Sequence, residues 1–187
     1  MYYHVSQTSG IQILKPRIST HHKAYVYAVD HFVTGLLFGA PQDDFDFIIS
    51  NHDVVHHGNI PVVYECYPNA FYSIFYGKSC SVYEVHEDGF QRGMTSWDAE
   101  LVCEQEVPVV REILVNDLYS RLSDEAAAGH LELHRYEDSI EYKKRISEHI
   151  VDRLIRFDAL DLTDERFQRH YSRIIAELHH IMDGHLL

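Results

Sequence analysis

The chain has 187 residues, of which 45% are hydrophobic and 12% aromatic, so it is long enough for one domain with a full core but short for two independent domains. Its formal charge is −13 with histidine neutral, and its 16 basic residues form no run longer than residues 143–145. Nucleic-acid binders concentrate positive charge on one face, so this composition argues against nucleic acid, while it leaves room for a local basic pocket that holds one pyrophosphate.

The first forty residues alternate short apolar runs with polar turns. Residues 2–5 and 25–29 are predicted to be strands, and residues 11–14 form a short apolar segment that ends before Pro16. The apolar spacing of residues 32–38 predicts a short helix, closed by the glycine and proline that follow it. We therefore expect strands and a helix together in this part of the chain.

A polar stretch follows, and from residue 60 onward the pattern becomes mostly β. Residues 42–59 are predicted to be a polar loop with one apolar strand at 45–49. Further strands are predicted at 61–66, 70–76, 81–85 and 101–103. The β-branched run at 107–115 is expected to be broken by Pro108. Because glycine-containing turns separate these strands, the pattern indicates an antiparallel, hairpin-rich sheet rather than a βαβ array.

The composition changes after residue 116, and the rest of the chain is predicted to be helical. Residues 116–128 are rich in alanine, leucine and glutamate, with Asn116 as the expected N-cap. Two later segments have apolar faces made of Ile146, Ile150, Leu154 and Phe157, and of Phe167, Tyr171, Ile174, Ile175, Leu178, Ile181 and Met182. We therefore expect an α+β fold, with an antiparallel β core over residues 1–118 and a C-terminal helical appendage over 119–187. The apolar faces would pack against the core or join two copies as a homodimer.

One polar residue interrupts each of three predicted strands: His4, Tyr27 and Glu100. A histidine, a tyrosine and a glutamate on three strands in that order resemble the triad of the diphtheria-toxin and poly(ADP-ribose) polymerase branch of the ADP-ribosyltransferases. The resemblance covers about residues 1–118 and implies an ADP-ribosyltransferase-like core with NAD as substrate. The activity that it implies is NAD-dependent mono-ADP-ribosylation of a protein target, or hydrolysis of NAD.

The resemblance gives each triad residue a role in that chemistry. Breaking the bond between nicotinamide and ribose leaves positive charge on the sugar, and a fixed carboxylate, Glu100, would stabilise it. Tyr27 would form one wall of the nicotinamide slot, and Phe38, eleven residues later, the other. Two aromatic faces around a planar ring add ~0.5–1.5 kcal/mol per pair beyond burial. We expect Tyr25 to lie on the opposite face of the strand from Tyr27 and to point away from the slot.

The first strand would hold the rest of the dinucleotide. The resemblance assigns His4 to a hydroxyl of the adenosine ribose, and the backbone of Val5 and the hydroxyl of Ser6 to nicotinamide and its ribose. The family usually has glycine after the histidine, because glycine lets the ligand approach the backbone closely. Val5 puts a branched side chain at that position. Either this side chain points away from the ligand, or the pocket differs from that of the family and catalysis is affected.

A second carboxylate pair competes with Glu100 for the catalytic role. Glu104 and Glu106 form a Glu-x-Glu, which in the arginine-specific branch of the transferases marks the catalytic loop. That branch also needs an upstream arginine and a Ser-Thr-Ser strand, and Arg17 with residues 19–20 matches these poorly. We therefore rank this pair behind Glu100.

Metal, disulfide and membrane sites are not indicated. Histidine pairs four residues apart occur at His52/His56 and His130/His134. Neither pair brings the glutamate of an HExxH zinc motif, so we expect surface histidines and no metal site. The cysteines at positions 66, 80 and 103 form no CxxC, and no apolar run approaches the ~18 residues of a membrane span. Without a signal region at the N-terminus, we expect a cytoplasmic protein.

A second class of function is compatible with the same residues. The chain could keep an ADP-ribosyltransferase-like fold and act as a non-catalytic interaction module. Its acidic surface and C-terminal helices would then engage a partner. A measurable affinity for NAD would favour the enzyme over the module.

Overall fold

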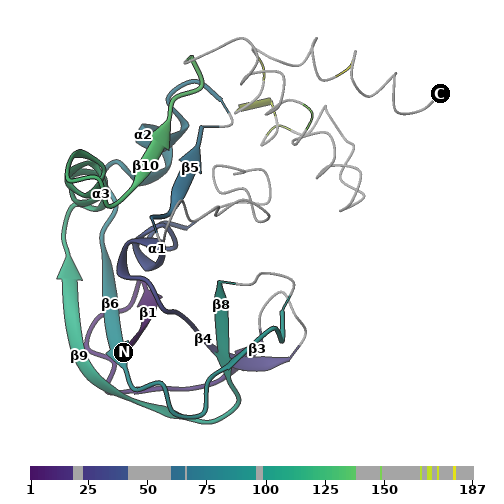
Figure 1. Ribbon diagram of the computed structural model, residues 1–187, viewed down its shortest axis with the longest axis vertical. Helices are drawn as coiled ribbons and strands as arrows, with labels where there is room; N and C mark the ends of the chain where they lie inside the picture. The colour runs from purple at the N-terminus through teal and green to yellow at the C-terminus, as the bar shows by residue number, and fades with distance from the viewer. Residues whose placement is uncertain are drawn as a thin grey trace.

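The computed structural model describes residues 1–18, 23–41, 60–65, 67–95 and 99–137, together with the single residues 148, 165, 168, 169, 172 and 179. Within these ranges the chain forms ten strands and three helices (Figure 1). In chain order the elements are β1 (Tyr2–Ser6), β2 (Ile13–Leu14), β3 (Arg17–Ile18), β4 (Ala24–Val29), α1 (Phe32–Leu36), β5 (Val62–Tyr64), α2 (Ala70–Phe75), β6 (Cys80–Val85), β7 (Gln91–Arg92), β8 (Glu100–Cys103), β9 (Val107–Val115), α3 (Leu118–Ala127) and β10 (Glu132–His134). The fold is α+β, as the sequence predicts.

Eight of the strands form one sheet in which every pairing is antiparallel. Their order is β2-β9-β6-β1-β4-β8-β7, and β3 pairs with β4 in addition. β5 and β10 form a separate parallel pair. Within the described ranges, β3 with β4 and β7 with β8 are the pairs formed by consecutive strands. The antiparallel prediction is therefore confirmed, but the hairpin-rich one is wrong, because most pairings join segments that are distant in the sequence.

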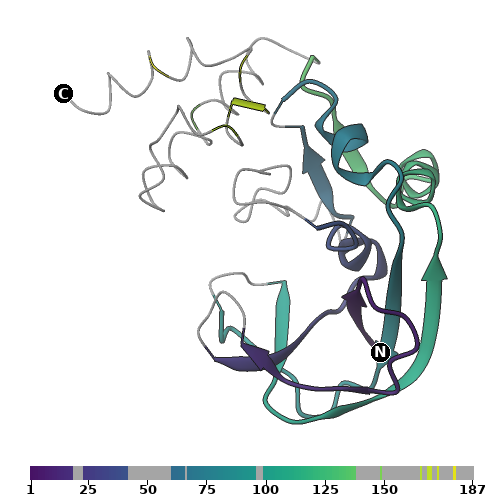
Figure 2. The same ribbon diagram turned by 180° about the vertical axis from the view of Figure 1, so that it is seen from behind.

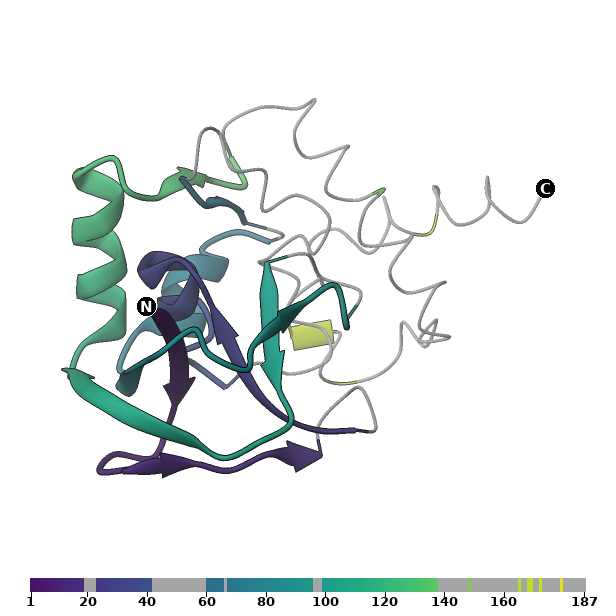
Figure 3. The same ribbon diagram turned by 60° about the horizontal axis from the view of Figure 1, so that its bottom comes forward.

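Alternate residues of the strands feed two separate hydrophobic clusters. Along β6, Cys80 and Val82 belong to a cluster that α1, α2 and α3 complete, whereas Tyr83 and Val85 belong to a second cluster with residues of β2, β4, β8 and β9. This is the period-two pattern of a strand buried on both faces. Figure 3 shows the three helices gathered on one side of the sheet. The second cluster lies on the sheet's other face.

The long strand β9 bends instead of breaking. Figures 1 and 2 show it as one curved ribbon along the side of the molecule, leading into α3. Glu84 pairs with Arg111 while Val85 pairs with Val109, so Val110 is an extra residue on β9. Such a bulge bends a strand and increases its twist. The expected break at Pro108 is wrong, since β9 runs through it with Pro108 opposite Ile13 in the short strand β2.

The strand predicted at 70–76 is wrong, because Ala70–Phe75 form the helix α2. The aromatic and β-branched residues there favour a strand locally. However, Phe71, Ile74 and Phe75 recur at intervals of three and four and are buried together in the first cluster, while Tyr72 is exposed. Burial of one helical face outweighs local strand propensity here.

The described part of the predicted appendage packs against the core. Helix α3 is as expected, although its N-cap is Asp117, whose carboxylate accepts from the amide of Ser120 at 2.9 Å, and not Asn116. Leu118 and Leu122 of α3 are fully buried in the first cluster, and β10 pairs with β5. The apolar faces predicted after residue 145 and the loop at 42–59 lie outside the described residues, so the helices and the homodimer stay predictions. No helix in the described ranges is long and apolar enough to cross a membrane.

Candidate functional site

The three strands that carry His4, Tyr27 and Glu100 lie side by side. The order β1-β4-β8 is part of the main sheet. Val29 of β4 pairs with Tyr3 of β1 and with Glu100 of β8, so the same point of β4 has both strands as neighbours. Three segments that are far apart in the sequence are thus brought together by strand pairing.

The register determines which side chains share a face. Directly opposite residues point to the same face, so Glu100 shares the face of Val29 and therefore that of Tyr27, two residues earlier. His4 is one residue after Tyr3 and belongs to the other face, where it pairs with Tyr83 at 6.2 Å between ring centroids. A ligand that touches all three side chains must therefore reach both faces.

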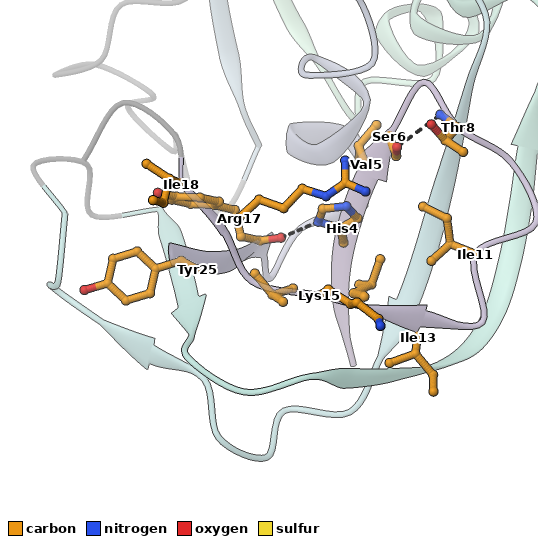
Figure 4. A pocket seen from close by; sticks show the side chains of 13 residues that line it. His4, Val5, Ser6, Thr8, Ile11, Ile13, Lys15, Arg17, Ile18 and Tyr25 are labelled. Carbon is orange, nitrogen blue, oxygen red and sulfur yellow. Dashed lines mark hydrogen bonds between the residues drawn. The ribbon is translucent and has the colours of Figure 1, made fainter. Parts of the chain in front are cut away.

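The backbone ladder between β1 and β4 ends next to His4, and we call the separation of the two strands there the opening. β1 and β4 pair at one position, Tyr3 with Val29, whereas β1 continues beside β6 as far as Ser6. Across the separation, Nδ1 of His4 donates to the backbone carbonyl of Tyr27 at 2.7 Å (Figure 4). The Tyr27 carbonyl thus accepts from the His4 imidazole instead of from a backbone amide of β1, and this bond links the two strands where their backbones have separated.

An open pocket of about 530 Å³ lies at this separation. Its lining comes from β1, from the turn after it, and from β2, β3 and β4: His4, Val5, Ser6, Thr8, Ile11, Ile13, Leu14, Lys15, Arg17, Ile18, Tyr25, Val26 and Tyr27. The walls combine apolar side chains with a few polar groups, which is the usual character of a small-molecule site.

His4 is a neutral hydrogen-bonding group at neutral pH. Burial lowers its imidazole pKa most strongly, the bond to the Tyr27 carbonyl opposes this shift, and the positive charge of Arg17 lowers the pKa further. Because a carbonyl only accepts, Nδ1 carries the proton and Nε2 of the neutral ring is an acceptor. Such a group suits a sugar hydroxyl, which can donate to it.

Tyr27 and Glu100 influence each other electrostatically. Burial is the largest cause that raises the pKa of the Tyr27 phenol, and the negative charge of Glu100 and the nearby Tyr25 raise it further. The phenol therefore stays protonated, and the Glu100 side chain lies close enough for its charge to act on Tyr27. A half-buried carboxylate beside an aromatic ring is well suited to stabilise a cation that forms there.

The expected orientation of Tyr25 is wrong. The rings of Tyr25 and Tyr27 meet edge to face, with 5.9 Å between centroids, and both residues line the pocket. The reason is the strand period itself, since residues two apart point to the same face. The two tyrosines therefore form one aromatic wall.

The other predicted ligand contacts lie near this opening. The side chain of Val5 packs toward α1, with Cγ2 3.3 Å from where a Cβ on Gly35 would lie, so the absence of a side chain at Gly35 makes room for it. Ser6 accepts from the amide of Thr8 at 3.0 Å. Phe38 follows α1 and is 42% exposed. Its pairing with Tyr27 around a nicotinamide ring stays a prediction.

Sequence reasoning missed the residues that fix the turn after β1. The hydroxyl of Tyr83 donates to the carbonyl of Thr8 at 2.7 Å and accepts from the amide of Ile11 at 3.2 Å. The Glu112 carboxylate accepts from the hydroxyl of Ser81 at 2.7 Å and from the amide of Gly10 at 3.0 Å. The sequence does show polar residues alternating with apolar ones in β6. This pattern indicates which side chains share a face, but their partners are known only once β6 is paired with β1 and β9.

The competing groupings do not form a site in the described residues. Glu104 pairs with Lys23 at 2.5 Å and Glu106 with Lys15 at 3.5 Å, and all four side chains are more than half exposed. No group of three or more potential metal ligands occurs in the part of the chain that the structure describes. Among the histidine pairs, His130 bonds to Glu125, whereas the pair at 52 and 56 lies outside the described residues.

Comparisons of the chain with protein-family models, with curated proteins and with solved structures found no match.

Proposed function

We propose that this chain is an NAD-dependent mono-ADP-ribosyltransferase or NAD-hydrolysing domain with an ADP-ribosyltransferase-like core. One observation carries the proposal: the strands that hold His4, Tyr27 and Glu100 are consecutive in the sheet, although the residues are 23 and 73 positions apart in sequence (27 − 4 and 100 − 27). The separation of β1 and β4 at His4 and the pocket beside it support the proposal, because a ligand that touches His4 as well as Tyr27 and Glu100 must reach both faces of the sheet.

In this proposal the Glu100 carboxylate acts on the ribose next to nicotinamide. The carbon–nitrogen bond breaks, its electron pair leaves with nicotinamide, and the ribose becomes an oxocarbenium ion. Water or a nucleophile of the target then attacks the same carbon and loses a proton. The carboxylate stabilises the positive charge at its maximum, so Glu100 binds the transition state more strongly than NAD itself.

The neighbouring residues would hold the dinucleotide in place. The Tyr27 ring offers the nicotinamide a flat apolar surface on the face of Glu100. Nε2 of the neutral His4 is suited to accept from a hydroxyl of the adenosine ribose on the other side of the opening. Because the Val5 side chain is packed toward Gly35, the backbone at Val5 can still approach the ligand from the His4 side.

The test is release of nicotinamide from NAD by the parent and by Glu100→Gln. The substitution keeps size and hydrogen-bonding capacity but removes the charge, so we expect turnover to fall about 10²–10³-fold while the affinity for NAD hardly changes. Glu104→Gln and Glu106→Gln are matched controls, since both are exposed and paired with lysines, and we expect mild effects.

The outcomes separate the candidate functions. A parent that turns over NAD with Glu100→Gln equally active and Glu106→Gln inactive would assign catalysis to the Glu-x-Glu pair. If the parent binds NAD without turnover, with and without added proteins, the site binds the dinucleotide but does not catalyse its cleavage. No binding at millimolar NAD would instead favour the non-catalytic interaction module.

A further inference from the structure

The pocket at the β1–β4 opening has an unusual charge for this protein. The chain carries a formal charge of −13, yet the described residues that line the pocket include no aspartate or glutamate, whereas they do include Lys15 and Arg17. An anion is repelled by the molecule as a whole and is attracted where cations gather without carboxylates. The pocket is such a place.

Arg17 is the stronger of the two cations. Lys15 has Glu106 3.5 Å from its Nζ, which neutralises part of its charge. For Arg17, the described residues provide no carboxylate at ion-pair distance. Figure 4 shows its side chain extending across the pocket toward His4 and Val5. Its charge also reaches His4, whose pKa it lowers.

The chemistry of this corner fits a phosphate better than a carboxylate or an apolar group. The arginine fork can bind two phosphate oxygens at once, and charge-assisted bonds of this kind are stronger than neutral ones. The neutral His4 beside it adds no charge but offers an acceptor for a sugar hydroxyl. A phosphate attached to a ribose satisfies both groups.

We infer that the pocket lined by His4, Lys15 and Arg17 binds the phosphate groups of a ribose-linked diphosphate, with Arg17 as the main contact. The inference is built on the proposed function, in which that ligand is the adenosine diphosphate half of NAD. Arg17 lies outside the His-Tyr-Glu triad, and by this inference it determines the affinity for the ligand. The phosphates then lie on the His4 side of the opening.

The experiment is calorimetric titration of the full chain with ADP-ribose, inorganic pyrophosphate and nicotinamide, each at low and high salt. We compare the parent with Arg17→Met, Arg17→Lys and, as a control, Lys78→Met, which removes an exposed cation outside the pocket. Arg17 is exposed, so the variants are expected to fold, and melting temperatures check this.

We expect Arg17→Met to weaken the binding of ADP-ribose and of pyrophosphate by about 10- to 100-fold, the range for a lost charged hydrogen bond, and to leave the affinity for nicotinamide unchanged. The affinity of Arg17→Lys for these two ligands should lie between those of the parent and Arg17→Met, and that of Lys78→Met should match the parent. High salt should weaken the binding of ADP-ribose and pyrophosphate but not that of nicotinamide. The inference is overturned if pyrophosphate does not bind the parent, or if Arg17→Met binds ADP-ribose as the parent does. If pyrophosphate binding depends on Arg17 but NAD is not turned over, the phosphate site stands and the proposed enzyme falls.

Discussion

The hydroxyl of Tyr83 fixes the turn that forms one wall of the pocket, and removing it should loosen both the fold and the site. The Tyr83 side chain is 0% exposed. Its hydroxyl donates its single proton to the carbonyl of Thr8 at 2.7 Å and accepts from the amide of Ile11 at 3.2 Å. The Glu112 carboxylate, at 3.1 Å, is the more distant of the two possible acceptors of that proton. Thr8 and Ile11 both line the pocket.

The substitution Tyr83→Phe removes this hydroxyl and keeps the ring. Two hydrogen bonds are lost, each contributing about 0.5–1.5 kcal/mol net, so the free energy of unfolding should fall by about 1–3 kcal/mol. For a chain of this size, that is a decrease of about 2–12 °C in melting temperature. Because the turn is released, affinity for ADP-ribose should also decrease.

The measurement is urea and thermal unfolding of the two proteins, followed by titration with ADP-ribose. Tyr2→Phe is the matched control. Tyr2 lies on β1 and points to the same face of the sheet as Tyr83, and its ring meets that of Phe90 edge to face, but no bond of its hydroxyl is seen within the described residues. Equal stability of Tyr83→Phe and Tyr2→Phe would refute the argument that the Tyr83 hydroxyl holds the turn.

Two further substitutions test the packing around the site. The hydrogen bond from the Ser81 hydroxyl, followed by that from the Gly10 amide, lowers the pKa of Glu112 in the folded protein. The Glu112 carboxylate therefore contributes its full stabilisation above its pKa in the unfolded chain, and this stabilisation is lost as pH falls through its lower pKa in the folded protein. Glu112→Gln should therefore lower the urea midpoint most at pH 7, with a difference that shrinks below about pH 4.5, and a difference that grows in acid would contradict this. Gly39→Ala would put a Cβ 2.7 Å from Sγ of Cys80 and should destabilise the fold by about 1–3 kcal/mol, and an unchanged melting temperature would mean that the neighbours move aside.

The strands of the candidate site could be predicted because their signal is local. Residues 2–5, 25–29 and 101–103 are short apolar runs with β-branched and aromatic residues, and each is a strand in the structure. The helix α1 was predicted from apolar spacing in the same way. The helix α2 was not, because its aromatic residues favour a strand until they are buried together on one face against α3.

The pairing of the strands could not be predicted from the sequence. Whether His4 shares a face with Tyr27 depends on one register position, Tyr3 with Val29, and a shift of one residue would reverse it. The side-chain bond from His4 to the Tyr27 carbonyl depends on the two strands separating there. By contrast, the shared face of Tyr25 and Tyr27 follows from their spacing alone and was open to prediction.

The most direct test of the account is an experimental structure of this chain with millimolar NAD. The account predicts the dinucleotide at the β1–β4 opening, with nicotinamide beside Tyr27 and the Glu100 carboxylate at the adjoining ribose. The diphosphate should lie toward Arg17 on the side of His4. NAD bound on another surface, or no bound NAD at that concentration, would contradict the central claim that β1, β4 and β8 form an NAD site.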